Sequence, residues 1–362
     1  MTELPEGSAI VYCEGAFGTP NGKTAHGLVR HTRRYTVLSV IDSRHAGADA
    51  REILDGRPGG IPVFADLRSA LEGAGGRATH LVIGLAPDGG RLPDPARETV
   101  AEAVRSGLNV DSGLHDFLCE DPVISRLASE KGVTLRDVRK PPPRDELHFF
   151  SGKIEEVTSF RIALLGTDSA VGKRTTAWMI SDALSAAGIP SQMIGTGQTA
   201  WMQGARFGIV MDSLINDFVS GEIEHAVWSA WKEAGARALV IEGQGSLMNP
   251  AYPGGFEILA AGRPHVIVMQ HAPARKEYDG FPGYALHPIE TQVRAAELLS
   301  GKPVVAVTLN HEGLDRAGLA EAAASITRST GLPAVDVLLE GAAGLVEILR
   351  PHMSAAGTAG GR

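Results

Sequence analysis

Short apolar runs alternate with longer, helix-like stretches along most of this chain. The alternation is typical of βαβ units, in which a helix carries the chain between two parallel strands. The predicted strands are 9–13, 36–41, 80–85 and 109–110 in the first part, and 161–165, 192–195, 238–242, 265–270 and 304–309 in the second. The pattern therefore predicts an α/β protein with two mostly parallel sheets.

Residues 94–106 (DPARETVAEAVRS) carry the signals of a complete helix between two strands of the first sheet. Asp94 can cap its N-terminus, Pro95 fits its first turn, and Gly107 is suited to end it.

Three consecutive prolines mark a break between two domains. Within 139–145 (RKPPPRD) they can neither continue a helix nor donate to a sheet, so we predict a stiff linker. We place a Rossmann-like domain at 1–140, a bridging segment at 141–158 and a second parallel-sheet domain at 159–352. The small, Gly-rich tail at 353–362 is predicted to be disordered.

Composition restricts the class of protein. The 362 residues, 43% hydrophobic and 21% charged, are ordinary for a soluble protein of about two domains. A net charge of −8 argues against a general nucleic-acid binder, which needs dense Lys and Arg. Cys13 and Cys119 form no CxxC pair, so neither a zinc site nor a disulfide framework is suggested.

The sequence has no signal-like start and no apolar run near the ~18 residues that span a bilayer. We therefore expect a cytoplasmic protein with no membrane or nucleic-acid partner. A homo-oligomer is expected from the general prevalence of symmetric assemblies, most simply a symmetric dimer.

A phosphate-binding loop (P-loop) is predicted at 166–176 (GTDSAVGKRTT), between a predicted strand and a helix. Gly166 allows a sharp turn after the strand, and Gly172 lets the backbone approach a phosphate closely. Backbone N–H groups and the positive helix end would face the anion, and Lys173 adds a full charge. The predicted cofactor-binding residues of this loop are Gly166, Thr167, Asp168, Ser169, Ala170, Val171, Gly172, Lys173, Arg174, Thr175 and Thr176. The alternative interpretation is a Gly-rich turn with an incidental Gly-Lys pair.

Two features distinguish this loop from the usual one. Five residues instead of four separate the first Gly from Gly-Lys, and Arg174 follows the lysine where Ser or Thr is usual. Thr175 or Thr176 could still offer a hydroxyl to Mg²⁺. Arg174 favours contact with an additional phosphate, since its planar fork suits bidentate phosphate binding.

The longer loop resembles that of dethiobiotin synthetase and its ATP-dependent relatives, whose loop reads GTDTxVGKT. The segment 238–250 (ALVIEGQGSLMNP) is similar to the acid-bearing strand end of that family. The resemblance implies that Glu242 is a metal or substrate ligand. It also implies that Asn310, which follows the strand at 304–309, recognises the base of a bound cofactor.

Further candidates follow the predicted strands. Glu242 closes its strand where open parallel sheets place ligands, although a helix cap or a solvated strand end is the alternative. Asp212 is a second acid, for which a turn or cap role is equally open. Residues 195–203 (GTGQTAWMQ) form another candidate wall of the site.

The loop at 271–287 (HAPARKEYDGFPGYALH) is rich in charged and aromatic residues, and loops at strand ends commonly carry function. Its alternative is a solvated surface loop. The predicted substrate-binding residues are Arg275 and Lys276, which could hold a carboxylate, with Tyr278 and Tyr284. The candidate catalytic bases are Glu242, Asp212, His271 and His287, among which the sequence does not choose.

The start of the first domain (YCEGAFGTPNGKTAHGLVRH) resembles a nucleotide-binding strand–loop–helix. Asp42 ends the next predicted strand, as a ribose-binding acid would. Gly15, Gly18 and Gly22 do not fit the GxGxxG spacing, so a domain with a dinucleotide and one without both remain open.

From about residue 8 to 350, the layout resembles the DgcN-type family of two-domain bacterial and archaeal proteins, long catalogued as a domain of unknown function. The loop with its Arg174 and the EGQGSLMNP segment carry the resemblance. It implies a Rossmann-like domain followed by a P-loop NTPase-like domain. It also implies acetyl transfer from acetyl-CoA to an amino acid such as D-glutamate, with Lys173 and Arg174 on the CoA phosphates. A dehydrogenase acting on the N-acetylated product is the implied pathway partner.

Three functions therefore remain open. The first is the N-acetyltransferase. The second is an ATP- and Mg²⁺-dependent ligase or kinase that activates a carboxylate, in which Thr175 and Glu242 would hold the metal. The third is a nucleotide-binding regulator without turnover. Metal dependence separates the first two, because phosphoryl transfer from ATP requires the cation.

Overall fold

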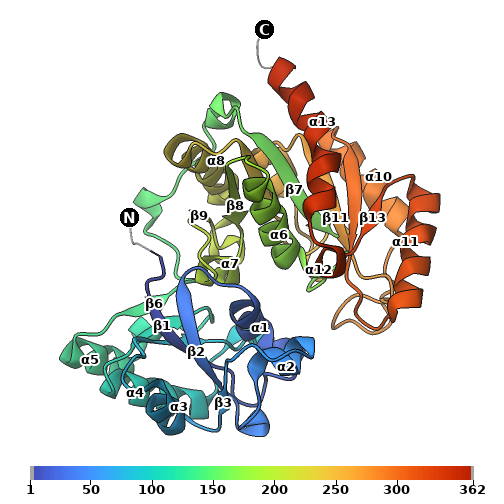
Figure 1. The fold of residues 1–362 in the computed structure, drawn as a ribbon. Helices are drawn as coiled ribbons and strands as arrows, with labels where there is room; N and C mark the ends of the chain where they lie inside the picture. The colour runs from blue at the N-terminus through green and yellow to red at the C-terminus, as the bar shows by residue number, and fades with distance from the viewer. Residues whose placement is uncertain (1–3, 360–362) are drawn as a thin grey trace. The chain divides into compact units, whose positions relative to one another are not determined.

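The computed structural model of the chain describes residues 4–359 and divides it into two compact units (Figure 1). The first comprises the residues up to Pro142 together with Gln198–Gly204, and the second comprises the remainder. Both contain parallel sheets, which confirms the predicted two-domain α/β class. Within residues 4–359, no helix has both the length and the apolar character needed to cross a membrane.

The first unit is a six-stranded parallel sheet in the order β3-β2-β1-β4-β5-β6. Its strands are β1 Gly7–Tyr12, β2 Tyr35–Ile41, β3 Val63–Phe64, β4 His80–Ile83, β5 Asn109–Ser112 and β6 Leu135–Asp137. Its main helices are α1 Lys23–Arg30, α2 Ala50–Asp55, α3 Leu67–Ala74, α4 Asp94–Arg105 and α5 Pro122–Lys131. Successive strands are added toward one edge of the sheet up to β3, and from β4 onward they are added toward the other edge. Right-handed crossovers therefore place α1 and α2 on one face and α3 to α5 on the other.

The start of α4 differs from the prediction. The helix begins at Asp94 itself, and Pro93 is the N-cap residue with no side-chain cap hydrogen bond. The prediction that Asp94 caps the helix is therefore wrong. Its negative charge in the first turn still stabilises the helix, because it lies near the positive end of the helix dipole. Gly107, with φ +83°, follows the end of the helix in the left-handed conformation that glycine tolerates.

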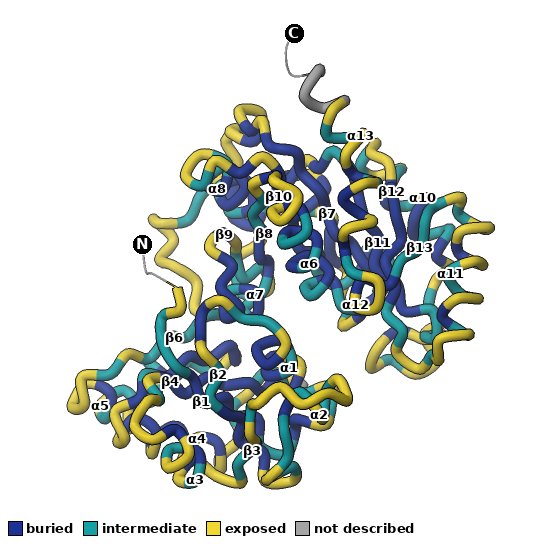
Figure 2. Tube along the Cα trace, viewed as in Figure 1, coloured by how far each residue is buried: buried dark blue, intermediate teal, exposed yellow. Residues whose placement is uncertain are grey.

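The second unit is a seven-stranded parallel sheet in the order β13-β12-β11-β7-β10-β8-β9. Its strands are β7 Phe160–Gly166, β8 Ser191–Gly195, β9 Phe207–Gly208, β10 Ala238–Glu242, β11 Val266–His271, β12 Val304–Leu309 and β13 Ala334–Val335. Its helices are α6 Lys173–Ala186, α8 Asn216–Ala234, α9 Phe256–Gly262, α10 Ile289–Ser300, α11 Arg316–Thr330, α12 Val337–Glu340 and α13 Ala343–Ala359. The central strands β7, β10, β11 and β12 are buried along their whole length (Figure 2), as expected of a parallel sheet covered on both faces.

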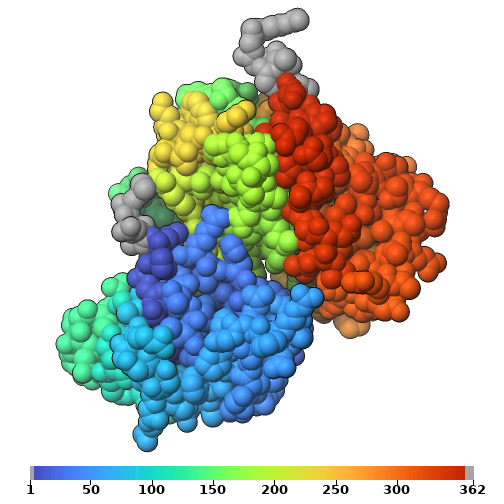
Figure 3. Space-filling model, in the orientation of Figure 1, coloured from blue at the N-terminus to red at the C-terminus, as the bar shows by residue number. Residues whose placement is uncertain are grey.

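Helix α13 packs on α6 (Figure 3), on the face of the sheet opposite α8 to α11. The helix continues through Ala359, so residues 353–359 are helical where the sequence predicts a disordered tail. Alanine-rich sequence such as SAAGTA can extend an existing helix, because alanine has the highest helix propensity. Residues 360–362 of the predicted tail lie outside the described residues.

A short helix, α7 (Gln198–Met202), belongs to the first unit although it follows β8 of the second. Gln203 donates to the carbonyls of Gly27 and His31, at 2.9 and 2.8 Å. The Trp201 ring lies 3.7 Å from the guanidinium of Arg34, whose Nε donates to the Trp201 carbonyl at 2.7 Å. The chain therefore passes between the two units three times, after residues 142, 197 and 204.

Buried charges surround the place where α7 is held. Asp111 is fully buried and accepts hydrogen bonds from the Tyr35 hydroxyl and from Arg136, at 2.6 and 2.7 Å for the latter. Glu6 pairs with both Arg34 and Arg136. The Arg136 guanidinium also lies 5.0 Å from the ring of Trp201 in α7. This network stabilises buried charge and the docked helix together.

Arg136→Met removes the cation that compensates the buried Asp111 carboxylate. We expect the free energy of unfolding to fall by about 3–5 kcal/mol, because an unpaired buried charge is left behind. Urea denaturation measures the change. The matched control is Arg126→Met, whose side chain is 70% exposed and should change stability by less than about 0.5 kcal/mol. Equal effects of the two substitutions would contradict the role of the network.

Candidate functional site

The loop between β7 and α6 has the backbone form of an anion cradle. A Cβ at Gly166 would lie 2.8 Å from Cδ of Lys173, so a larger residue there would displace the lysine side chain. Gly172 has φ +107° and Ala170 has φ +52°, both in the left-handed region. Left-handed turns just before a helix N-terminus are the backbone arrangement that binds phosphate in other proteins.

Lys173 is buried beneath this loop. Its ammonium donates to the carbonyls of Asp168 and Gly245, at 2.7 and 2.8 Å. Burial lowers the pKa of Lys173 to about 8, against the opposing effect of the nearby Asp168 and Glu242 carboxylates. The side chain is therefore mostly cationic at pH 7 and can exchange a carbonyl partner for a phosphate oxygen.

Asp168 is fully buried and connects the loop to two others. Its carboxylate accepts from the backbone of Ser169 and Asp279, at 2.7 and 2.9 Å, and from the Asn249 amide at 2.9 Å. It also forms an ion pair of 3.1 Å with Arg275. The loops after β10 and β11 are thus fixed to the phosphate loop through one side chain.

Arg275 is held against the phosphate loop as well. Its guanidinium donates to the carbonyl of Ser169 at 2.7 Å and pairs with Glu312 at 3.0 Å. Arg275, which the sequence predicts to bind a substrate carboxylate, is therefore already bonded to groups of the protein. The neighbouring Lys276 is exposed.

Glu242, the last residue of β10, is a buried acid at the carboxyl edge of the sheet. Its Oε2 accepts from the N–H of Thr196 at 2.9 Å, and its carbonyl accepts from the Thr196 hydroxyl at 3.1 Å. Burial raises the pKa of Glu242, while the charges of Arg174 and Lys173 oppose that rise. The structure thus brings Glu242, Lys173 and Arg174 into one electrostatic environment.

His271 closes β11 and is buried beside the loop. Its Nδ1 lies 2.9 Å from the hydroxyl of Thr167. Burial lowers the pKa of His271 to about 4, so the imidazole is neutral at pH 7. The preceding Gln270 accepts from the hydroxyls of Thr176 and Thr308 at 2.6 Å each, which directs Thr176 toward the strand.

Of the remaining candidates, Tyr278 is buried and His287, Tyr284 and Asp212 are exposed. Tyr278 is buried, with its hydroxyl 2.7 Å from Nδ1 of the exposed His287, and burial raises its pKa. Tyr284 is 57% exposed and makes an edge contact with Phe281. Asp212 is exposed, on the same short turn (Met211–Ser213) as Met211, whose N–H donates to the carbonyl of Thr196 at 3.1 Å.

Both polar atoms of Asn310 are engaged by the protein. Its amide donates to the carbonyl of Val171 in the phosphate loop at 3.1 Å, and its oxygen accepts from the N–H of Glu312 at 3.0 Å. Asp42 is engaged in the same way in the first unit, where its carboxylate accepts from the backbone of Phe17 and Arg44. Each side chain therefore stabilises its own turn and also holds a loop that is distant in sequence.

Thr196 lies in the predicted wall 195–203 without being singled out there, and Asn249 and Gln270 are not predicted as site residues; all three contact residues of the site. A signal exists for Gln270, because a polar side chain near the end of an otherwise apolar parallel strand lies where such sheets place ligands. Asn249 is part of the EGQGSLMNP segment, but its partner Asp168 lies 81 residues away in sequence.

Comparison with known proteins gives matches along most of the chain. The P-loop domain of a domain of unknown function (DUF1611_C) matches residues 148–346, and its Rossmann-like partner (DUF1611_N) matches residues 43–141. A D-glutamate N-acetyltransferase from Tritonibacter scottomollicae is 30% identical over 285 residues, covering 75% of this chain and 81% of the relative. Another, from a Pseudoalteromonas species, is 30% identical over 288 residues, covering 77% and 83%. The crystal structure of a DUF1611 family protein from Anabaena variabilis superposes with a TM-score of 0.88 at 30% identity, over 95% of this chain and 99% of that one.

The lowered pKa of Lys173 predicts pH-dependent anion binding. Only the protonated ammonium attracts phosphate, so we expect the affinity for ADP to fall about tenfold between pH 7 and pH 9. Isothermal titration calorimetry measures it. Lys173→Met should bind ADP more weakly and without this pH dependence. Wild-type affinity in Lys173→Met would contradict the assignment of the loop.

Proposed function

We propose that this chain, which belongs to the DUF1611 family, transfers the acetyl group of acetyl-CoA to the amine of D-glutamate or a closely similar amino acid. The observation that carries the proposal is the agreement of two relatives. Both are 30% identical over about three quarters of this chain, and both are named D-glutamate N-acetyltransferases.

The phosphate loop supplies a binding site for the donor. CoA carries a pyrophosphate and a ribose phosphate, and the turns at Gly166 and Gly172 leave backbone N–H groups free of side-chain bulk where phosphate would lie. Lys173 contributes charge from beneath the loop. Arg174, at the start of α6, contributes a planar fork suited to a second phosphate. No phosphoryl group moves in this reaction, so the loop serves binding alone.

The chemistry requires a base. The acceptor ammonium must lose a proton before its nitrogen attacks the thioester carbonyl. The C–N bond then forms, the C–S bond breaks, and the second proton of the nitrogen passes to the departing sulfur, so that CoA leaves as the thiol. We assign proton removal to Glu242, since a carboxylate with a raised pKa accepts protons more readily than an ordinary one near neutral pH. His271 is the weaker candidate, because its pKa of about 4 makes it a poor base.

The acceptor's carboxylates need cations. Arg275 is tied to Asp168, Ser169 and Glu312, so we assign it to positioning the phosphate loop rather than to the substrate. The exposed Lys276, on the same loop, is then the better partner for a substrate carboxylate.

Thiol release from acetyl-CoA tests the function directly. Purified protein should release CoA thiol with D-glutamate, more slowly or not at all with L-glutamate, and equally well with a chelator present. Absence of release with any amino acid, together with Mg²⁺-dependent ADP formation from ATP, would replace this proposal with the ligase or kinase.

Glu242→Gln tests the base. We expect kcat to fall about 100-fold or more, because general base catalysis typically contributes that much, while the Kd for CoA stays near its wild-type value. In the wild type, kcat/KM should rise with pH as Glu242 loses its proton, and the variant should lack that rise. The control is Glu277→Gln, an exposed acid on the loop after β11. Full activity of Glu242→Gln would exclude this residue as the base.

A further inference from the structure

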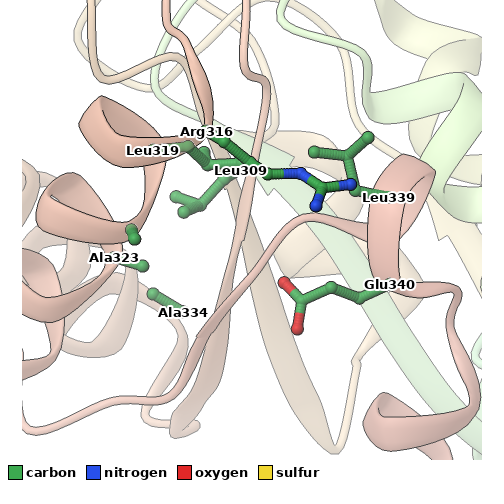
Figure 4. Close-up of a pocket in the computed structure, with 8 residues that line it drawn as sticks. Leu309, Arg316, Leu319, Ala323, Ala334, Leu339 and Glu340 are labelled. Carbon is green, nitrogen blue, oxygen red and sulfur yellow. The ribbon is translucent and has the colours of Figure 1, made fainter.

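A pocket of ≈ 490 Å³ lies in the second unit between α11, α12 and the ends of β12 and β13 (Figure 4). Leu309, Leu319, Ala323 and Leu339 provide apolar walls, and Arg316 and Glu340 provide charges. Its volume falls within the range of about 300–1,000 Å³ that is usual for small-molecule sites. Apolar walls with a few polar groups are the usual lining of such sites.

The pocket adjoins the phosphate loop. Leu309 ends β12, and the next residue, Asn310, donates to the carbonyl of Val171 in the loop at 3.1 Å. Helix α12, which carries Leu339 and Glu340, packs against α6, the helix that begins at Lys173. A ligand with phosphates in the loop therefore has this pocket as a neighbour at the carboxyl edge of the same sheet.

The two charged side chains extend toward the pocket from different elements (Figure 4). Arg316 begins α11 and is exposed, and Glu340 ends α12. One oxygen of Glu340 accepts from the N–H of Asp336 at 3.0 Å, which fixes the carboxylate. The pocket therefore offers an acceptor and a cation around an apolar interior.

We propose that this pocket receives the adenine base of the donor whose phosphates the P-loop holds, which rests on the proposed function. The flat ring lies between the apolar walls, Glu340 accepts from its exocyclic amine, and Arg316 faces the ribose phosphate. Asn310, whose amide already bonds Val171 and Glu312, lies beside the pocket and keeps one N–H and one lone pair for the edge of the base. D-Glutamate is a poor occupant, because two carboxylates and an ammonium would be costly to bury against leucine and alanine.

Ala320→Trp tests the assignment from an exposed position of the lining, where an indole can fill the pocket without disturbing the core. We expect the Kd for CoA, measured by calorimetry, to rise about tenfold, which corresponds to about 1.4 kcal/mol of lost packing of the base against the apolar walls. The ratio of kcat/KM for acetyl-CoA to that for acetyl-pantetheine, which has no nucleotide, should fall by the same factor. Ala324→Trp is the matched control, since Ala324 is exposed on the same helix outside the pocket lining and should leave both quantities unchanged.

Arg316→Ala adds an independent readout. It should weaken binding of CoA but not of 3′-dephospho-CoA, which lacks the ribose phosphate. Wild-type Kd values for CoA in both Ala320→Trp and Arg316→Ala would overturn the pocket assignment. A wild-type protein that binds CoA yet acetylates no amino acid would overturn the proposed function instead, and the binding comparison among the variants would still decide the pocket.

Discussion

Burying a carboxylate costs free energy unless donors surround it, and in this protein that condition falls on Asp168. Its donors come from three segments: the phosphate loop itself, Asn249 after β10, and Arg275 with the N–H of Asp279 after β11. Each segment supplies a donor to the same buried carboxylate, so moving any one of them would leave that charge less well hydrogen-bonded. The conformation of the phosphate loop therefore depends on three segments, of which the GTDSAVGKRTT sequence is only one.

Burial also determines the protonation states around the cradle. It raises the pKa of Glu242, and it lowers the pKa of His271 to about 4 and that of Lys173 to about 8. Each shift favours the uncharged form, as expected where water is excluded. A bound phosphate would reverse this tendency for Lys173 by stabilising its ammonium. Anion binding in the loop and the protonation state of Lys173 are coupled in this way.

The sequence predicts the parts of this protein whose signals are local. Apolar runs identify the central strands of both sheets, and the spacing of Gly166, Gly172 and Lys173 identifies the loop; the family resemblance drawn from that loop is confirmed by the matches to both domains. The edge strands β3, β6, β9 and β13 escape prediction because two or three residues make no recognisable run. The pairing of Asp168 with Arg275, 107 residues later, also escapes, because nothing in HAPARK distinguishes the cation that turns inward from the one that faces water.

Helix α7 has a consequence for the order in which the protein can be completed. As the chain leaves the ribosome, every strand of the first sheet has been made by residue 137, but the helix that Arg34 and Gln203 hold in place arrives about sixty residues later. By then the phosphate loop and α6 have already been synthesised. The first unit therefore lacks α7 until the phosphate loop and α6 of the second unit have been synthesised. The first unit is therefore incomplete when its own continuous stretch of chain ends, and a cut at the prolines would separate it from α7.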